Sequence, residues 1–210
     1  LSAQHRLWAM LEALVEGTEH AAPGLRDEVY NRQTKKVLER VMRLDSNAVD
    51  VGTFRGEILE DMVEVSPAGT HHGFEPLPTF FETLKMRFPK PNVTIHPLAL
   101  SQAPGEMTFV HVVTNPGYSG LKERDYDEEE KTKEIKVQVE TLDRVLDPKH
   151  RVDFLKVDVE GAELQVLQGA KRILCTQKPV VVFEFEVRGA TSYGATPKGA
   201  WEQLKAPCGL

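Results

Sequence analysis

The chain has 210 residues, of which 40% are hydrophobic and 28% are charged. This composition is typical of a globular domain and not of a fibrous or disordered protein. The formal net charge of −6 argues against a nucleic-acid partner, because nucleic-acid-binding surfaces are normally basic. No stretch approaches the roughly 20 apolar residues that span a bilayer, so we expect no membrane partner either.

Cysteine usage and the first residues bear on the cellular compartment. Cys175 and Cys208 are the two cysteines of the chain, and we interpret them as free thiols in a reducing environment. The apolar residues 7–15 carry Glu12 near their centre and lack the cleavage pattern of a signal peptide. We therefore expect a cytoplasmic protein.

Hydrophobic periodicity divides the chain into two predicted parts. Apolar residues recur at helical spacing over 7–15 and 34–43, which predicts an N-terminal helical extension over residues 1–45. From residue 46 onward, strand-like runs alternate with amphipathic helices. The first three of these runs are 49–51, 71–75 and 93–100. Strands that alternate with helices over short connections predict a parallel sheet with right-handed crossovers.

A polar stretch interrupts this alternation at residues 114–134. Strand-like residues at 107–113 and 135–139 flank it, and it is too long for a simple connection. We expect a lid, a binding loop or a disordered excursion there. Tyr118 and Ser119 lie at its first turn, where contact with a substrate and an ordinary surface turn both remain open.

Alternation resumes after the polar stretch, with predicted strands at 154–159 and 180–185 and predicted helices at 162–174 and from Pro197. The chain ends directly after this last helix, where one more strand is expected. The sequence therefore predicts a doubly wound, mostly parallel α/β sheet over residues 46–210 that lacks its final strands.

The first chemical motif is the run 47–56, Asn-Ala-Val-Asp-Val-Gly-Thr-Phe-Arg-Gly. An apolar strand delivers Asp50 and then bends at Gly52 and Gly56 before an amphipathic helix. A glycine lets the main chain approach a ligand without a Cβ in the way, and the helix offers unpaired N–H groups to an anion. The D-x-G-x-x-x-G spacing differs from the dinucleotide pattern G-x-G-x-x-G. The residues expected to bind a nucleotide-like cofactor here are Asp50, Gly52, Thr53 and Gly56.

Two further residues follow the second and third predicted strands. Glu75 comes a little over twenty residues after Gly52, where an acid accepts hydrogen bonds from ribose hydroxyls in nucleotide-binding α/β sheets. A surface glutamate at a strand end is the alternative. Ser101 follows the third strand, where the adenine edge of a cofactor could lie, although short polar residues at strand ends are usually turn formers.

The second chemical motif is the run 153–163, Asp-Phe-Leu-Lys-Val-Asp-Val-Glu-Gly-Ala-Glu. Lys156, Asp158 and Glu160 share one side of a predicted central strand, where charge is costly unless it is paired or used. The next strand brings Glu184 to the same carboxyl edge. Clustered acids raise one another's pKa and can supply a general base. We therefore expect Asp158, Glu160 and Glu184 to be catalytic.

Two alternatives to this catalytic interpretation stay open. Asp158 could simply pair with Lys156, while Glu163 interacts with the dipole of the helix that it begins. Magnesium held by Asp158 and Glu160 is a second alternative, but no third oxygen ligand is evident. The histidines are not joined to carboxylates at zinc-ligand spacing, so the sequence predicts no metal site.

Together these motifs resemble class I S-adenosylmethionine-dependent methyltransferases, specifically the FkbM family. The resemblance covers most of the chain from about Tyr30 onward, and its segments are 49–52 with 56, 74–76, 98–101, 155–163 and 193–197. It implies S-adenosylmethionine as the cofactor, with Asp50, Gly52 and Gly56 along its methionine part and Glu75 on its ribose. The family's reactions are O-methylations of polyketide or sugar hydroxyls.

We therefore expect a methyltransferase that acts on a hydroxyl of a small molecule or glycan. Asp158 or Glu160 would take up or orient the hydroxyl proton, with Glu184 behind them, and Asp158 is expected to contact the cofactor as well. The alternatives are a nicotinamide-dependent oxidoreductase, which the missing third close glycine disfavours, and a binding module without catalysis. The oligomeric state is left open, with a homo-oligomer as one option.

Overall fold

The computed structural model describes residues 23–123, 126, 129–185, 187–196, 198–199, 201–202 and 205. Three features named above lie outside this part of the chain. They are the helix predicted over 7–15, the residue Pro197 at which the last helix is expected to begin, and Cys208.

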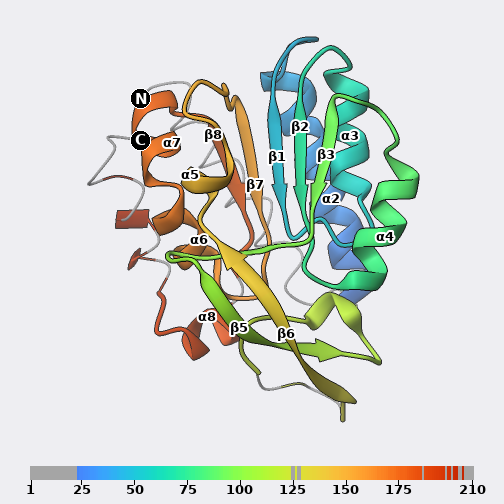
Figure 1. Ribbon diagram of the computed structural model, residues 1–210, viewed down its shortest axis with the longest axis vertical. Helices are drawn as coiled ribbons and strands as arrows, with labels where there is room; N and C mark the ends of the chain where they lie inside the picture. Colours follow the sequence, from blue (N-terminus) through green and yellow to red (C-terminus); the bar gives the residue numbers. More distant parts are fainter. Residues whose placement is uncertain are drawn as a thin grey trace.

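A five-stranded parallel sheet forms the centre of the molecule (Figure 1). Its strands are β1 (Ala48–Val51), β2 (His71–Phe74), β3 (Val93–His96), β7 (Phe154–Val157) and β8 (Val180–Phe183), in the order β3-β2-β1-β7-β8. The prediction of a mostly parallel sheet is confirmed. The strand order reverses between β1 and β7, and open α/β sheets bind ligands outside the carboxyl ends of their strands at such a point.

Helices cover both faces of this sheet, as a doubly wound fold requires (Figure 1). One face carries α2 (Pro23–Val41), α3 (Glu57–Val65) and α4 (Pro78–Arg87), and the other carries α5 (Leu142–Val145), α6 (Glu163–Gly169) and α7 (Lys171–Gln177). The apolar stripe of α3 packs into the first core with Val37 and Leu38 of α2; its members are Ile58, Leu59, Met62 and Val63. The second core contains Val166 and Leu167 of α6. Both cores exclude water from the sheet, which is the main favourable contribution to folding.

Helix α2 is longer than the sequence predicts. It begins at Pro23 and not at residue 34, because the fixed φ of proline suits the first turn of a helix, where a missing N–H costs nothing. Its residues Val37 and Leu38 belong to the same core as α3. The division of the chain into 1–45 and 46–210 stays a prediction.

A second, three-stranded sheet lies beyond the carboxyl ends of β1 and β2 (Figure 1). It consists of β4 (Ala99–Leu100), β5 (Gly105–Val112) and β6 (Thr132–Glu140), in the order β4-β6-β5 with β5 and β6 antiparallel. The single strand predicted over 93–100 is wrong. It is divided into β3 and β4 around Pro97, which has no N–H to continue a ladder. The predicted loop 114–134 begins with a short 3₁₀ helix, η1 (Pro116–Tyr118).

Two observations bear on the expected compartment. Cys175 in α7 is disulfide-bonded, so its interpretation as a free thiol is wrong, and the argument for a reducing environment loses this support. Within the described residues, no helix is both long and apolar enough to cross a membrane. The cytoplasmic location stays a prediction.

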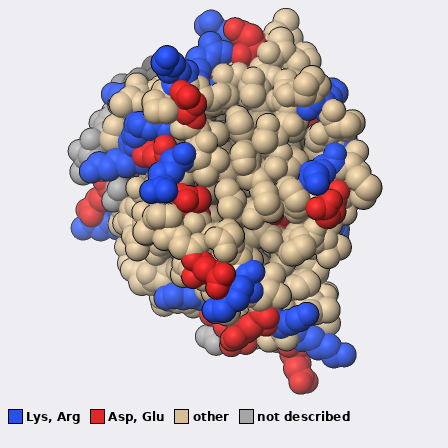
Figure 2. All heavy atoms as spheres, in the orientation of Figure 1, with Lys and Arg blue, Asp and Glu red and all other residues tan. Residues whose placement is uncertain are grey.

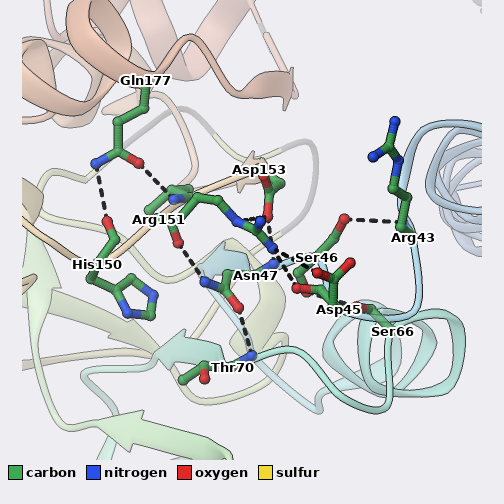
Figure 3. Close-up of polar contacts among 11 residues, drawn as sticks. Arg43, Asp45, Ser46, Asn47, Ser66, Thr70, His150, Arg151, Asp153 and Gln177 are labelled. Carbon is green, nitrogen blue, oxygen red and sulfur yellow. Dashed lines mark hydrogen bonds and ion pairs between the residues drawn. The ribbon is translucent and has the colours of Figure 1, made fainter.

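One polar network holds the amino ends of β1, β2 and β7 together (Figure 3). Asn47, directly before β1, accepts a hydrogen bond from Thr70 N through Oδ1 (2.8 Å) and donates one to Arg151 O through Nδ2 (2.9 Å). Its backbone N–H donates to Asp153 Oδ2 (2.8 Å), which also pairs with the Arg151 guanidinium. Because these residues precede the three strands, the network fixes the register that brings their carboxyl ends together.

Candidate functional site

The chain leaves β1 through a tight bend at residues 52–56. The N–H groups of Gly52 and Thr53 both donate to Phe74 O, at 3.1 and 3.0 Å, and the Thr53 hydroxyl donates to Asp50 O at 3.0 Å. Gly52 and Gly56 have φ angles of 80° and 87°, which residues with a side chain rarely adopt. The bend thus places the predicted cofactor-binding residues of the first motif at the carboxyl edge of the sheet, beside β2.

The two glycines of the bend make room for the protein's own atoms. A Cβ on Gly52 would lie 1.7 Å from Asp158 O, and a Cβ on Gly56 would lie 2.7 Å from Leu84 Cδ2. The interpretation that each missing side chain leaves space for a ligand is therefore wrong. Glycine is required because the end of β7 and helix α4 approach the bend so closely. Contact between a cofactor and the backbone of Gly52 and Gly56 stays a prediction.

Glu75 follows β2 and is hydrogen-bonded to this bend. Only 4% of the residue is exposed, and its carboxylate accepts the N–H of Phe54 (2.9 Å) and of Leu77 (2.8 Å). Burial raises the pKa of Glu75 to about 7, although both N–H groups lower it. The alternative of a surface glutamate is therefore wrong. Each carboxylate oxygen keeps a second lone pair, so Glu75 can also accept a hydrogen bond from a ligand hydroxyl.

Asp50 on β1 and Lys156 on β7 are direct neighbours in the sheet. Lys156 Nζ lies 3.0 Å from Asp158 Oδ2 and 3.8 Å from Asp50 Oδ1. Burial would lower the pKa of Lys156, but the negative charges of Asp158 and Asp50 outweigh burial and raise it. The alternative in which Asp158 pairs with Lys156 is thus confirmed.

Asp50 is buried without a hydrogen-bond donor. Its side chain is 1% exposed, and neither of its carboxylate oxygens has a hydrogen-bond partner. Burial raises its pKa to about 6, although the positive charge of Lys156 lowers it. Because a buried carboxylate without donors is costly, Asp50 is suited to receive a cationic donor from a bound molecule.

Glu184 comes to the same edge of the sheet from the neighbouring strand. It follows β8, and its N–H donates to Val157 O at the end of β7 (3.1 Å). Its negative charge also contributes to the raised pKa of Lys156. Asp158 and Glu184 therefore both stabilise the charged form of Lys156. Their catalytic roles stay predictions.

The turn after β7 holds Glu160 in the left-handed region of backbone conformation. Glu160 has a φ of 57° and Gly161 a φ of 107°. Glu163 fixes this turn by accepting the N–H groups of Val159 and Gly161, each at 3.0 Å. Glu163 is 1% exposed, and burial raises its pKa to about 7 although these N–H groups lower it. The prediction that Glu163 interacts only with the helix dipole is therefore incomplete, because its carboxylate also holds the turn that contains Glu160.

Gly120, which pairs with Val110 of β5, lies beside this turn. A Cβ on Gly120 would lie 3.6 Å from Glu160 Cβ and 3.7 Å from the Tyr193 hydroxyl. Burial raises the pKa of the Tyr193 hydroxyl, although the backbone N–H groups of Lys122 and Leu121 lower it. Ser119 is buried, and its hydroxyl oxygen accepts the N–H of Val112 on β5 (3.0 Å). Glu160 and Tyr193 therefore face the segment that follows η1, whereas Ser119 fastens that segment to β5.

Ser101 follows a strand of the second sheet and not a strand of the first. It follows β4, and its N–H donates to Glu140 O on β6 (2.9 Å). Its contact with an adenine ring stays a prediction. Among the described residues, no three His, Cys, Asp or Glu side chains are grouped so that they could hold a metal ion.

Sequence reasoning assigned no role to two residues of this edge. Phe54 lies in the bend between the two glycines, and its N–H binds Glu75. Tyr193 belongs to a segment quoted for the family resemblance, and that segment is the one signal that could have marked it. Phe54 could have been noticed by its position. A bulky residue is unexpected between two glycines that require positive φ.

Comparisons with known proteins point to one family. Residues 50–197 match the family model described as Methyltransferase FkbM domain. A curated relative, Methyltransferase 1 from Beauveria bassiana (strain ARSEF 2860), is 31% identical over 145 residues, which are 60% of this chain and 58% of the relative. The crystal structure of Methyltransferase FkbM from Methylobacillus flagellatus KT has a similar fold, with a TM-score of 0.52 and 17% identity, over 90% of this chain and 52% of that one. The chain thus spans little more than half the length of each.

Proposed function

The chain belongs to the FkbM methyltransferase family, and from this premise we propose that it is an S-adenosylmethionine-dependent methyltransferase. Its proposed acceptor is a hydroxyl of a small molecule, a polyketide or a sugar. One observation carries the proposal. The unsatisfied carboxylate of Asp50 lies on β1 just before the bend 52–56, and the buried carboxylate of Glu75 accepts the Phe54 N–H within that bend, at the edge of the sheet where the strand order reverses.

The residues of this edge suit the two polar parts of S-adenosylmethionine. Asp50, whose oxygens lack donors, would accept the methionyl ammonium. Glu75 would accept the ribose hydroxyls through the lone pairs that its two N–H partners leave free. The remaining proposed cofactor contacts are those of Gly52, Thr53, Gly56, Ser101 and Asp158.

When bound, S-adenosylmethionine supplies a methyl group on a sulfonium, which is already an activated leaving group. The protein therefore has to align the acceptor hydroxyl and to take up its proton. Asp158 Oδ2 already accepts a hydrogen bond from Lys156 Nζ at 3.0 Å, so this carboxylate is engaged within the protein. We assign proton uptake to Glu160, which lies beside Gly120, the residue that pairs with Val110 of β5. Asp158 and Glu184 then act mainly by keeping Lys156 charged.

The charge distribution supports a small-molecule acceptor. On the face shown in Figure 2, acidic and basic side chains are interspersed and do not form one basic surface. Nucleic-acid-binding proteins gather Lys and Arg on the face that meets the phosphates. The proposed acceptor is accordingly a small molecule or glycan and not a nucleic acid.

Calorimetric titration of the chain with S-adenosylhomocysteine tests the proposed cofactor site. We expect binding that weakens about tenfold or more in Asp50→Asn and in Glu75→Gln. The matched control Glu82→Gln changes an exposed carboxylate of α4 and should leave the affinity unchanged. Wild-type affinity should fall as the pH drops from 8 to 6, because the pKa values of about 7 for Glu75 and about 6 for Asp50 mean that both acceptors gain protons there.

Two results would favour the other candidate functions. Binding of NADH in place of S-adenosylhomocysteine would indicate a nicotinamide-dependent oxidoreductase. Binding of neither compound would favour a module without catalysis. Equal affinity in the wild type and in both site variants would remove Asp50 and Glu75 from the cofactor site.

A further inference from the structure

Three non-glycine residues in the described part of the chain have positive φ angles. They are Phe54 (50°), Glu160 (57°) and Lys178 (54°). Lys178 is the cap residue at the carboxyl end of α7, a position that commonly takes this conformation. Glu160 is held in its turn by the Glu163 carboxylate, which accepts the N–H groups on either side of it. Phe54 remains to be explained, because for a bulky residue a positive φ is a genuine outlier.

The contacts of Phe54 connect three parts of the site. Its backbone N–H donates to Glu75 Oε2 at 2.9 Å. Its ring lies 4.7 Å from the ring of Phe80 on α4, centroid to centroid, and 4.9 Å from the guanidinium of Arg55. The ring also reaches η1, because a Cβ on Gly117 would lie 4.0 Å from Phe54 Cζ. One strained residue thus lies against the proposed ribose-binding acid, helix α4 and η1.

The segment that the Phe54 ring meets also reaches the other strained residue of the site. η1 packs beside Phe54 through Gly117, and three residues later Gly120 packs beside Glu160 and pairs with Val110 on β5. Residues 116–120 therefore run from the bend after β1 to the turn after β7. Backbone strain of this kind persists when the surroundings over-determine it, and it gathers at functional sites.

We propose that Phe54 is a positioning residue that couples the cofactor-binding bend to residues 116–120, so that cofactor binding orders the acceptor side of the site. The proposal rests on the proposed function. A ribose that engages Glu75 fixes the carboxylate, the carboxylate fixes the Phe54 N–H, and the ring then fixes η1. The ring is held in place by its contacts with the Phe80 ring and the Arg55 guanidinium.

Hydrogen exchange measured by mass spectrometry on the full chain, with and without S-adenosylhomocysteine, tests this coupling. In the wild type we expect the ligand to slow exchange in residues 116–120 by about fivefold or more. Phe54→Asn removes the ring and places in the bend a residue that tolerates positive φ. With S-adenosylhomocysteine at a saturating concentration, it should lose the protection of residues 116–120. Phe54→Leu, which keeps an apolar side chain, should retain part of that protection.

Lys178→Asn is the matched control. It relieves the strain of the same positive-φ conformation at the end of α7. It should leave the ligand-dependent protection of residues 116–120 unchanged. If Phe54 had only a structural role, its substitution would change the stability of the protein and leave that protection intact.

Three results would overturn the coupling. The first is full protection of residues 116–120 in Phe54→Asn, and the second is no protection in a wild type that binds the ligand. The third is loss of ligand affinity in both Phe54 variants, which would make Phe54 a direct cofactor contact. A wild type that does not bind S-adenosylhomocysteine would refute the proposed function itself, and the coupling with it.

Discussion

The ammonium of Lys156, near the carboxyl end of β7, donates a hydrogen bond of 3.0 Å to Oδ2 of Asp158, the residue that follows this strand. The same ammonium lies 3.8 Å from Asp50 Oδ1 on the adjacent strand. The Lys156 side chain is 12% exposed and that of Asp158 is 29% exposed. Charges removed from water to this degree are stable only as a set, because the loss of one leaves the others uncompensated.

Replacing Lys156 by methionine should therefore be costly. We expect Lys156→Met to lower the free energy of unfolding by about 3 kcal/mol at pH 8, the lower end for a broken buried ion pair because Asp158 is partly exposed. The loss should shrink towards pH 5, because Asp50, with a pKa of about 6, then becomes neutral. Urea denaturation across this pH range measures the difference.

A surface lysine supplies the control for that measurement. Lys35 pairs with Asp61 and Glu64, and its side chain is 37% exposed, so Lys35→Met should cost much less stability than Lys156→Met across this pH range. Equal losses for the two lysine variants would mean that the buried set around Lys156 is no more tightly coupled than a surface ion pair.

Substitution of Gly52 tests whether packing requires a glycine in the bend after β1. A Cβ there would lie 1.7 Å from Asp158 O, at a φ of 80°, so Gly52→Ala would push apart the ends of β1 and β7. We expect a loss above about 4 kcal/mol, which is exceptional for a single substitution. Gly194 has a φ of 69° and no heavy atom within 4 Å of a Cβ, so Gly194→Ala should cost only about 1 kcal/mol. Thermal denaturation compares them, and similar melting temperatures would disprove the close approach.

Glu160 is the residue to which we assign proton uptake. Glu160→Gln keeps the size of the side chain and removes the base, so methyl transfer should fall by about 10²–10⁴-fold while affinity for S-adenosylhomocysteine stays unchanged. The assay is transfer from labelled S-adenosylmethionine to a panel of sugar and polyketide hydroxyls. Glu184→Gln should have a smaller effect, because this acid acts through Lys156. Undiminished transfer by Glu160→Gln would return the role to Asp158.

Much of the main sheet follows from local patterns in the sequence. Apolar runs of strand length between amphipathic helices predict β1, β2, β7 and β8, and they place β3 within a longer predicted strand. The alternation of Lys156 and Asp158 with apolar residues also predicts charged side chains at the carboxyl edge, where the structure places them. These features depend on spacing within one segment, which a single sequence contains.

Other features depend on contacts between distant segments. Ala99 pairs with Val139 in the second sheet, and no pattern near Ala99 specifies that partner, so β3 and β4 are predicted as one strand. The space beside Gly52 is filled by Asp158 O, which the bend itself does not encode. For Glu163, the helix start is visible in the sequence, but its hydrogen bonds to the preceding turn depend on a backbone conformation that the sequence does not specify.

Asn47 lies at the opposite end of the sheet and should matter for stability alone. Asn47→Ala leaves the Thr70 N–H and the Arg151 carbonyl without a partner, so we expect a loss of about 1–2 kcal/mol. Affinity for S-adenosylhomocysteine should not change in the protein that remains folded. Asn31→Ala, on the exposed surface of α2, should stay within about 0.5 kcal/mol of the wild type. A fall in affinity for Asn47→Ala at full folding would show that the amino-end network also shapes the cofactor site.

Three histidine rings come together on the α5–α7 face of the main sheet. His72 Nδ1 lies 3.0 Å from His96 Nε2, and the rings of His72 and His150 meet edge to face at 4.8 Å. Neither His72 Nε2 nor His150 Nε2 has a hydrogen-bond partner. Burial, together with the charges of His150, His96 and His71, lowers the pKa of His72 to about 3.

This lowered pKa makes the folded state sensitive to acid. In the unfolded chain His72 takes up a proton near pH 6.5, whereas in the folded state it does so only near pH 3, so stability is lost as the pH falls between these values. The contribution of His72 is at most about 1.4 kcal/mol per pH unit. Asp50, Glu75 and Glu163, whose pKa values are raised, act in the opposite direction. The test is therefore a difference between two proteins and not one stability curve.

His72→Phe keeps an aromatic ring beside His96 and removes the titrating group. Relative to the wild type, its free energy of unfolding should rise steadily as the pH is lowered from 6.5 to 4.5, as followed by urea denaturation. The ring proton signals of His72 in the NMR spectrum of the folded wild type should show no titration above about pH 5. Parallel stability curves for the two proteins, or a His72 signal that titrates near pH 6.5, would mean that these rings are not protected from protonation.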